Sequence, residues 1–106
     1  MKKFELKDMK GGWFVGDFLP TAFSSKDCEV AFKQYKAGGY DAKHLPKVAT
    51  ELTVFVKGSG LLNGIEYKEG DIILLEPGEA TDFKALTDAE MVVVKIPSVK
   101  GDKYPA

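Results

Sequence analysis

The chain has 106 residues, 29% of them charged and 44% hydrophobic, which is the length and composition of one globular domain. Its 16 acidic side chains nearly balance 15 basic ones, which argues against nucleic acid as a partner because such proteins carry a basic surplus. All cations are lysine, His44 is the only histidine and Cys28 the only cysteine. Disulfides within the chain, zinc sites built on several cysteines and sites that need two histidines from one chain are therefore excluded.

No segment is apolar for long enough to cross a membrane. The longest apolar runs are 72–75 and 91–94, whereas a spanning helix needs about 18 residues. The first ten residues mix charges with apolar side chains and lack the apolar stretch of a signal peptide. We therefore expect a cytoplasmic protein with one free thiol and no membrane partner.

Glycine and proline divide much of the chain into pieces of strand length, and the apolar residues follow a period of two rather than 3.6. The only stretch that could be helical is 21–27. Asn63-Gly64 is the strongest short hairpin signal. The predicted strands, in chain order, are 13–15, 29–36, 50–57, the two arms of a hairpin over 60–68, then 71–76, 81–85 and 91–96. This pattern indicates an all-β sandwich or barrel with at most one short helix, near the N-terminal third, and an irregular tail from 97 to 106.

Four residues in the middle of the chain have the spacing of a known motif. Gly38, His44, Glu51 and Gly58 reproduce the first motif of the cupin family, which the chain resembles over 38–85. The family has histidine at the position of His44 and again at the position of Pro46. The chain therefore keeps the spacing of this motif but lacks one of its two histidines.

A second, weaker resemblance follows further along. Gly70-Asp71, Gly78 and Thr81 resemble the second cupin motif, with Pro77 one place later than the family's proline. The family usually has histidine where Thr81 stands. The resemblance implies a jelly-roll barrel of two antiparallel sheets around a cavity, in a single cupin-like domain over 1–106 with a barrel core at about 12–97.

The resemblance also implies a reduced metal site. Cupins that bind iron, manganese or zinc hold the ion with three histidines and one glutamate, of which only His44 and Glu51 remain here. Asp82 could substitute, but strand alternation turns it away from the cavity if Thr81 faces inward. Because catalytic sites keep at least three protein ligands, we expect no tightly bound metal and no other cofactor. The alternative is a divalent metal held by these two ligands.

The predicted strand 50–57 has two apolar faces. Glu51 and Thr53 share parity with Phe55 and are expected to face the cavity. The opposite face needs a cover, and small cupins commonly dimerise, so we expect a homodimer. The alternative cover is the chain's own segment around Trp13 and Phe14. The residues of that opposite face are Leu52, Val54 and Val56.

The leading hypothesis is a protein that binds a small molecule in the cavity. Polar walls without arginine favour a neutral or mildly polar ligand such as a carbohydrate, on which Trp13, Tyr35 or Tyr40 could stack. The candidate cavity residues are His44, Glu51, Thr53, Thr81 and Tyr40.

Two alternatives stay open. The first is a metal-dependent or acid–base enzyme acting on a sugar or small acid, in which His44 and Glu51 transfer protons. The second is an interaction protein with a vestigial cavity, which predicts a filled barrel. The sequence leaves open whether the protein is an enzyme at all.

Overall fold

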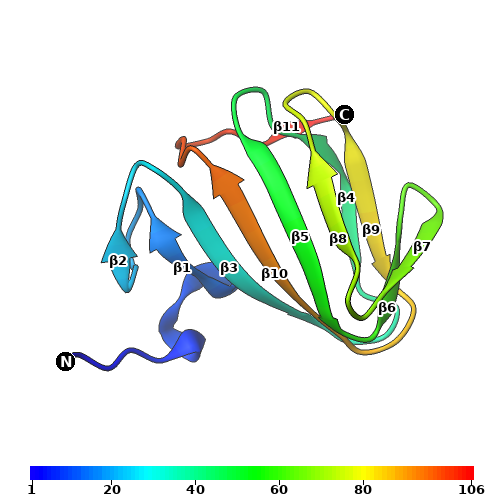
Figure 1. Cartoon of the computed structure of the whole chain (residues 1–106), viewed down its shortest axis with the longest axis horizontal. Coiled ribbons are helices and arrows are strands. Elements are labelled where there is room, and N and C mark those ends of the chain that lie inside the picture. Colours follow the sequence, from blue (N-terminus) through cyan, green and yellow to red (C-terminus); the bar gives the residue numbers. More distant parts are fainter.

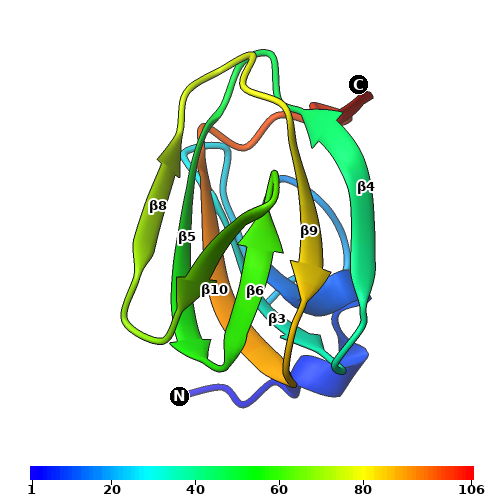
Figure 2. The same ribbon diagram turned by 90° about the vertical axis from the view of Figure 1, so that its right-hand side faces the viewer.

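Two β-sheets face each other across the interior of the protein (Figure 1; Figure 2). The computed structural model describes all residues from 1 to 106. The six-stranded sheet has the order β2-β1-β3-β10-β5-β8, and the five-stranded sheet has the order β11-β4-β9-β6-β7. Every neighbouring pair is antiparallel except β1 and β2. After two 3₁₀ turns, η1 (Leu6–Asp8) and η2 (Lys10–Gly12), the strands are β1 (Trp13–Gly16), β2 (Phe23–Ser24), β3 (Glu29–Tyr35), β4 (Tyr40–Leu45), β5 (Thr50–Lys57), β6 (Ser59–Leu62), β7 (Ile65–Lys68), β8 (Ile72–Leu75), β9 (Thr81–Ala85), β10 (Ala89–Ile96) and β11 (Tyr104–Pro105).

This architecture confirms the predicted all-β fold of two antiparallel-rich sheets with almost no helix. The sheets do not close into a continuous barrel, because β2 and β8 remain as edges of one sheet and β11 and β7 as edges of the other. No helix of the structure has both the length and the apolar character required to cross a membrane.

Three local predictions were wrong. Residues 21–27 form no helix, because β2 pairs in parallel with β1 and the Thr21 hydroxyl donates to the Phe14 carbonyl at 2.9 Å. Strand β4 was missed, since its exposed residues Ala42 and Lys43 follow no alternation of apolar and polar side chains. The tail is irregular only in part, because β11 pairs with β4.

The predicted hairpin is present between β6 and β7. Asn63 and Gly64 form its turn with φ angles of 50° and 77°, the left-handed values that these two residue types adopt most readily. The Asp82 carboxylate accepts a hydrogen bond from the Asn63 amide at 3.0 Å, and the Asp82 amide donates to the Asn63 side-chain oxygen at 3.1 Å. These bonds hold the hairpin to β9 and confirm that the side chain of Asp82 points away from the interior.

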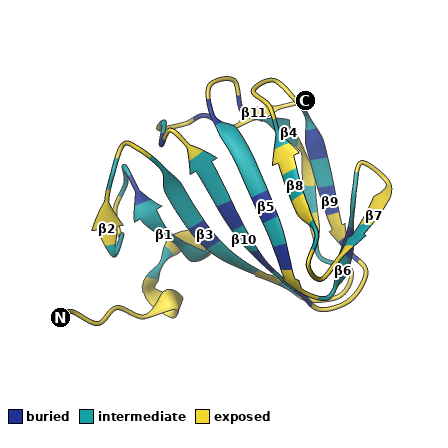
Figure 3. Cartoon of the chain, in the orientation of Figure 1, coloured by how far each residue is buried: buried dark blue, intermediate teal, exposed yellow.

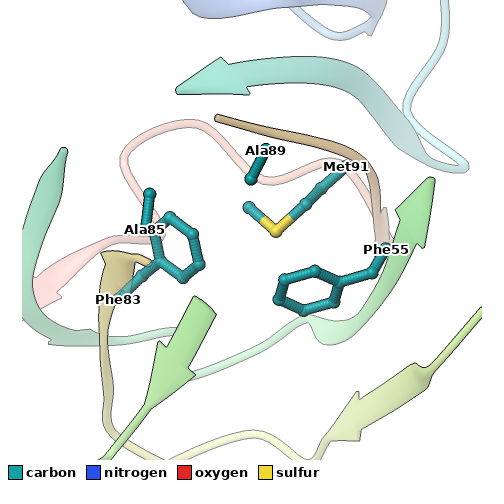
Figure 4. Packing of buried hydrophobic residues seen from close by; sticks show 5 residues of the cluster. All are labelled: Phe55, Phe83, Ala85, Ala89 and Met91. Atoms are coloured by element: carbon teal, nitrogen blue, oxygen red, sulfur yellow. The ribbon is translucent and has the colours of Figure 1, made fainter. Parts of the chain in front are cut away.

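The inner face of the six-stranded sheet carries charged side chains at one end of its strands and apolar side chains at the other. At one end the register places Lys95 of β10 between Glu29 of β3 and Glu51 of β5. At the other end Met91 lies opposite Phe55. Met91 and Phe55 pack with residues of the facing sheet in a small apolar core (Figure 4) of Phe55, Phe83, Ala85, Ala89 and Met91. The interior therefore has an apolar end, which the core fills, and a polar end.

Close packing at the apolar end depends on one glycine. Gly60 of β6 lies opposite Ala85, and a Cβ atom on it would be 2.4 Å from the nearest ring carbon of Phe83. The missing side chain gives the Phe83 ring its space. Burial of a phenylalanine side chain stabilises a fold by about 1.5–3 kcal/mol, so the core holds the two sheets together at this end.

The outer face of the six-stranded sheet is apolar and partly open to solvent (Figure 3). Ile72 and Leu74 on the edge strand β8 are 68% and 53% exposed, and Val56 is 42% exposed. Strand β1 does not cover β5, because β3 and β10 lie between them in the same sheet, so the proposed N-terminal cover was wrong. The register extends this face as two apolar rows, Val30–Val94–Leu52–Leu74 and Phe32–Val92–Val54–Ile72.

The Asp102 carboxylate holds the C-terminal tail against the loop between β4 and β5. It accepts hydrogen bonds from the backbone amides of Lys47 at 2.8 Å, Val48 at 3.2 Å and Ala49 at 2.9 Å. Burial alone would raise the pKa of this carboxyl group, but the three amide donors and the charge of Lys95 outweigh it and hold the pKa below its ordinary value. The tail then continues into β11, so Asp102 fixes one wall of the polar end.

We expect Asp102→Ala to lower the free energy of unfolding by about 2–3 kcal/mol, because it leaves three amides without their acceptor. Denaturant unfolding followed by circular dichroism measures this change. Since the folded-state pKa is depressed, the contribution is present above the ordinary carboxyl pKa and is lost as pH falls through the folded value. The difference from wild type should therefore shrink below about pH 4. Asp27→Ala, at an exposed carboxylate without hydrogen bonds, is the matched control. Equal stability of Asp102→Ala and wild type at neutral pH would contradict this assignment.

Candidate functional site

A cavity of about 330 Å³ occupies the polar end of the interior. Both sheets and the C-terminal tail line it. Four of the five residues proposed for the site lie on its wall, namely His44, Glu51, Thr53 and Thr81. Tyr40 does not, because its side chain is 60% exposed and the neighbouring Asp41 takes the inward position on β4. That part of the sequence interpretation was wrong.

A bulge in β4 brings two polar residues to the same wall. Asp41 lies opposite Phe83 and His44 lies opposite Thr81, so three steps along β4 match two steps along β9. Without this extra residue, strand alternation would put Asp41 and His44 on opposite faces. The His44 Nδ1 atom lies 2.9 Å from the Ala42 carbonyl oxygen, which can only accept a hydrogen bond. Nδ1 therefore carries a proton, and in the neutral ring Nε2 is left as an acceptor.

Glu51 pairs with a lysine. Its Oε1 atom lies 3.9 Å from the Lys95 Nζ atom, and the two side chains are only 13% and 12% exposed. The two residues face each other in the register of β5 and β10. Because an inward carboxylate is costly unless it is paired or hydrated, this contact explains how Glu51 can face the interior.

A second lysine, Lys33 on β3, enters the wall without an acidic partner. It forms no ion pair within 4.0 Å, and its Nζ atom lies 5.2 Å from the centre of the Trp13 ring. Burial lowers the pKa of its ammonium group; Asp41 opposes this shift, while Lys103 and Lys95 add to it. Glu51 also opposes it, more weakly.

Tyr35 and Asp41 form a hydrogen-bonded pair beside Lys33. The Tyr35 hydroxyl donates to the Asp41 carboxylate, and its ring packs against Phe83 with the ring centres 4.7 Å apart. Burial raises the pKa of the Tyr35 hydroxyl well above its usual range, and the bond to Asp41 and the charges of Asp41 and Glu51 raise it further. This pair fixes the carboxylate of Asp41 at the cavity wall.

Sequence reasoning missed Lys33, Lys95 and Asp41. Strand alternation could have identified Lys95, because it lies on the same face of the strand 89–96 as Met91 and Val93, which are buried. No such signal existed for Asp41, because its inward position depends on the bulge. Lys33 shares parity with the buried Ala31, yet the sequence alone does not say which face of that strand is inward.

The residues present do not fit a tightly held divalent metal. His44 and Glu51 both line the cavity, but no three histidine, cysteine, aspartate or glutamate side chains come together in a metal-binding group. Thr81 contributes only a neutral hydroxyl, and Pro46 has no donor side chain. The ammonium group of Lys95 also stands beside Glu51, where a cation would have to bind. The expectation of a protein without a tightly bound metal stays a prediction.

We therefore expect purified protein to contain far less than one equivalent of iron, manganese, nickel or zinc by elemental mass spectrometry. Addition of these ions should leave the melting temperature unchanged. Near-stoichiometric metal that disappears in His44→Ala would overturn this expectation, and Lys84→Ala on the outer side of β9 serves as the control.

Comparisons with solved structures agree on the fold. A Klebsiella pneumoniae protein with a double-stranded β-helix domain superposes with a TM-score of 0.67 at 23% identity, over 73% of this chain and 69% of that one. KdgF from Halomonas sp. gives 0.64 at 16% identity, over 71% of this chain and 74% of that one. The DMSP lyase DddQ from Ruegeria pomeroyi gives 0.71 at 16% identity, over 89% of this chain and 49% of that one.

No protein-family model matches the chain, and no curated protein matches it in sequence. The structural likeness therefore establishes the fold, which is the double-stranded β-helix of the cupins, as the motif spacing predicts. Because this fold carries both enzymes and proteins of unknown activity, it does not by itself define a reaction.

Proposed function

We propose that this protein binds a small organic molecule in the cavity at the polar end of its interior, without needing a tightly bound metal. The observation that carries the proposal is the cavity itself. Its volume of about 330 Å³ falls at the lower end of the range of ligand sites, roughly 300–1,000 Å³. An interaction protein with a vestigial cavity predicts a filled interior instead, so the cavity supports ligand binding over that alternative.

The composition of the wall supports the same proposal. The aromatic rings of Trp13 and Tyr35 offer flat apolar surface, and His44, Thr53 and Thr81 offer hydrogen-bonding groups. A carbohydrate suits this mixture, because its ring stacks on aromatic faces and its hydroxyl groups need several polar partners. The lysines in the wall add charge that the sequence interpretation did not include, so anionic groups are also accommodated.

The enzyme alternative has weaker support. His44 and Glu51 share the cavity wall, but no hydrogen bond joins them. The His44 ring is held by the Ala42 carbonyl and Glu51 is paired with Lys95. Proton transfer between His44 and Glu51 therefore stays a prediction without a geometry that favours it.

A cavity-filling variant tests ligand binding. Thr53→Phe places a ring in the cavity and should abolish the rise in melting temperature that a panel of monosaccharides and small organic acids produces in wild type. Lys84→Phe, at an exposed position on the outer side of β9 and outside both the cavity and the apolar face, should keep that response. Native mass spectrometry of the purified protein identifies any molecule that copurifies. If no compound shifts wild type, or if Thr53→Phe responds as wild type does, the cavity is not the binding site.

We also propose that a second copy of this chain covers the apolar outer face of the six-stranded sheet. Its two apolar rows run across four strands and carry no charged side chain. An apolar face of this kind is complementary to itself, which is what a two-fold dimer interface requires. Exposed Ile72 and Leu74 continue this face to the edge strand β8.

Light scattering with size-exclusion chromatography tests the dimer. Leu74→Glu puts a charge in the proposed interface and should convert the dimer to a monomer, whereas Lys84→Glu on the other sheet should not. A wild-type protein that is monomeric at micromolar concentration would contradict this proposal.

A further inference from the structure

Lys33 stands apart from the other lysines of the cavity wall because its surroundings in the sheet are apolar. The register places it opposite Met91 of β10, and the next inward residues along β3 are the buried Ala31 and the half-buried Tyr35. No carboxylate lies within ion-pair distance of its Nζ atom. Lys95, in contrast, has Glu51 beside it.

The two ammonium groups also share one aromatic ring. Lys33 Nζ and Lys95 Nζ lie 5.2 Å and 5.4 Å from the centre of the Trp13 indole, and Lys103 of the tail lines the same cavity. Lys95 is paired with Glu51, and the charges of Lys103 and Lys95 both lower the pKa of Lys33. A lysine that is desolvated and next to other cations is the type that becomes a neutral, nucleophilic amine.

We propose that the Lys33 Nζ atom forms an imine with the carbonyl group of a small aldehyde or ketone held in the cavity. This inference rests on the proposed function, since it assigns a chemical class to the ligand of the same cavity. The open-chain form of a sugar and a 2-oxo acid share this carbonyl chemistry. The hydroxyl groups of the first suit the polar wall, and the carboxylate of the second suits Lys95 and Lys103.

The reaction balances without an oxidant or a cofactor. The lone pair of the neutral Lys33 amine attacks the carbonyl carbon, and the electrons of the carbonyl π bond move to its oxygen to form a carbinolamine. The carbon–oxygen bond then breaks as the carbon–nitrogen double bond forms, and the oxygen leaves as water with both hydrogens of the amine. The charged groups that face Lys33 are Asp41 from β4, Glu51 from β5, Lys95 from β10 and Lys103 from the tail.

Of these groups, the Asp41 carboxylate is suited to carry the proton from nitrogen to oxygen. Its charge is the largest opposing influence on the Lys33 ammonium group, and Tyr35 holds it in place by a hydrogen bond. The carbinolamine can therefore form and lose water to give the imine within one small group of side chains on β3 and β4.

Reductive trapping tests the proposal. Wild-type protein is incubated at neutral pH with cyanoborohydride and either glyceraldehyde, a neutral sugar aldehyde, or pyruvate, a 2-oxo acid. The reduced adduct adds the mass of the probe less one oxygen atom, and peptide mass spectrometry locates it. We expect modification of Lys33 several-fold above that of exposed Lys84 with at least one probe, and the preferred probe distinguishes the sugar source from the 2-oxo acid source. Equal or lower modification of Lys33 with both probes would overturn the proposal.

Two variants test the nucleophilic amine of Lys33 and the effect of a neighbouring charge on it separately. Lys33→Arg keeps the positive charge but has no nucleophilic amine of this kind, so the cavity adduct should disappear while labelling of Lys84 persists. Lys103→Met removes a nearby cation, which should raise the Lys33 pKa and reduce trapping at neutral pH, with a loss that diminishes as the pH is raised. A loss that stays the same at every pH would instead indicate a structural effect of Lys103 and would count against the proposed electrostatic activation. The mapping in wild type decides the proposal even if Lys33→Arg fails to fold.

The two proposals fail differently. If sugars or acids raise the melting temperature of wild type but not of Thr53→Phe, and Lys33 is not trapped, the cavity binds a ligand without covalent capture. If no compound binds and Lys33 is not trapped, the cavity itself is not a ligand site.

Discussion

The ion pair between Lys95 and Glu51 is the interaction on which the interior of this protein depends. Lys95 lies on β10 and Glu51 on β5, the two long strands at the centre of the six-stranded sheet. Both side chains face inward, because each lies four residues from a core residue on the same face of its strand, Met91 on β10 and Phe55 on β5. Burial of either charge alone would be costly. As a pair, Lys95 and Glu51 allow charged side chains at the inward-facing positions next to Val93 on β10 and Thr53 on β5. The sheets therefore separate around a cavity at this end, while at the other end Phe55 and Met91 bring them together.

The C-terminal tail completes that cavity. Its residues 99–103 line the cavity, and the three amides that bind Asp102 belong to the loop that leads from β4 into β5. The loop and the tail thus stabilise each other, and β11 then extends the sheet beside His44. A short segment with little secondary structure of its own in this way shapes the site, because a single buried carboxylate satisfies three backbone donors at once.

The wall of the cavity differs in kind from a metal centre. Positions that would supply further ligands carry Pro46 and Thr81, whereas positive charge comes from lysine side chains on β3 and β10. Lysine ammonium groups differ from a bound ion in that each is fixed to its own strand and can change its protonation state with its surroundings. Lys33 has apolar neighbours in the sheet and no carboxylate within ion-pair distance, and burial lowers the pKa of its ammonium group.

The sequence by itself determined the features that depend on neighbouring residues. The Asn63-Gly64 turn, the extent of β5 and β9, the inward parity of Glu51 and Thr53, and the outward position of Asp82 follow from local turn chemistry and from strand alternation. The spacing of His44 and Glu51 also placed both residues in the cavity wall.

Only the tertiary structure decided the features that depend on pairing between distant segments. The bulge that turns Asp41 inward exists because β4 pairs with β9, about forty residues later. Lys95 and Glu51 meet through the register of β5 and β10, and the Asp102 carboxylate joins segments more than fifty residues apart. The closing of a loop of this length is decided by the sum of many contacts across the fold, and no local pattern of residues records it.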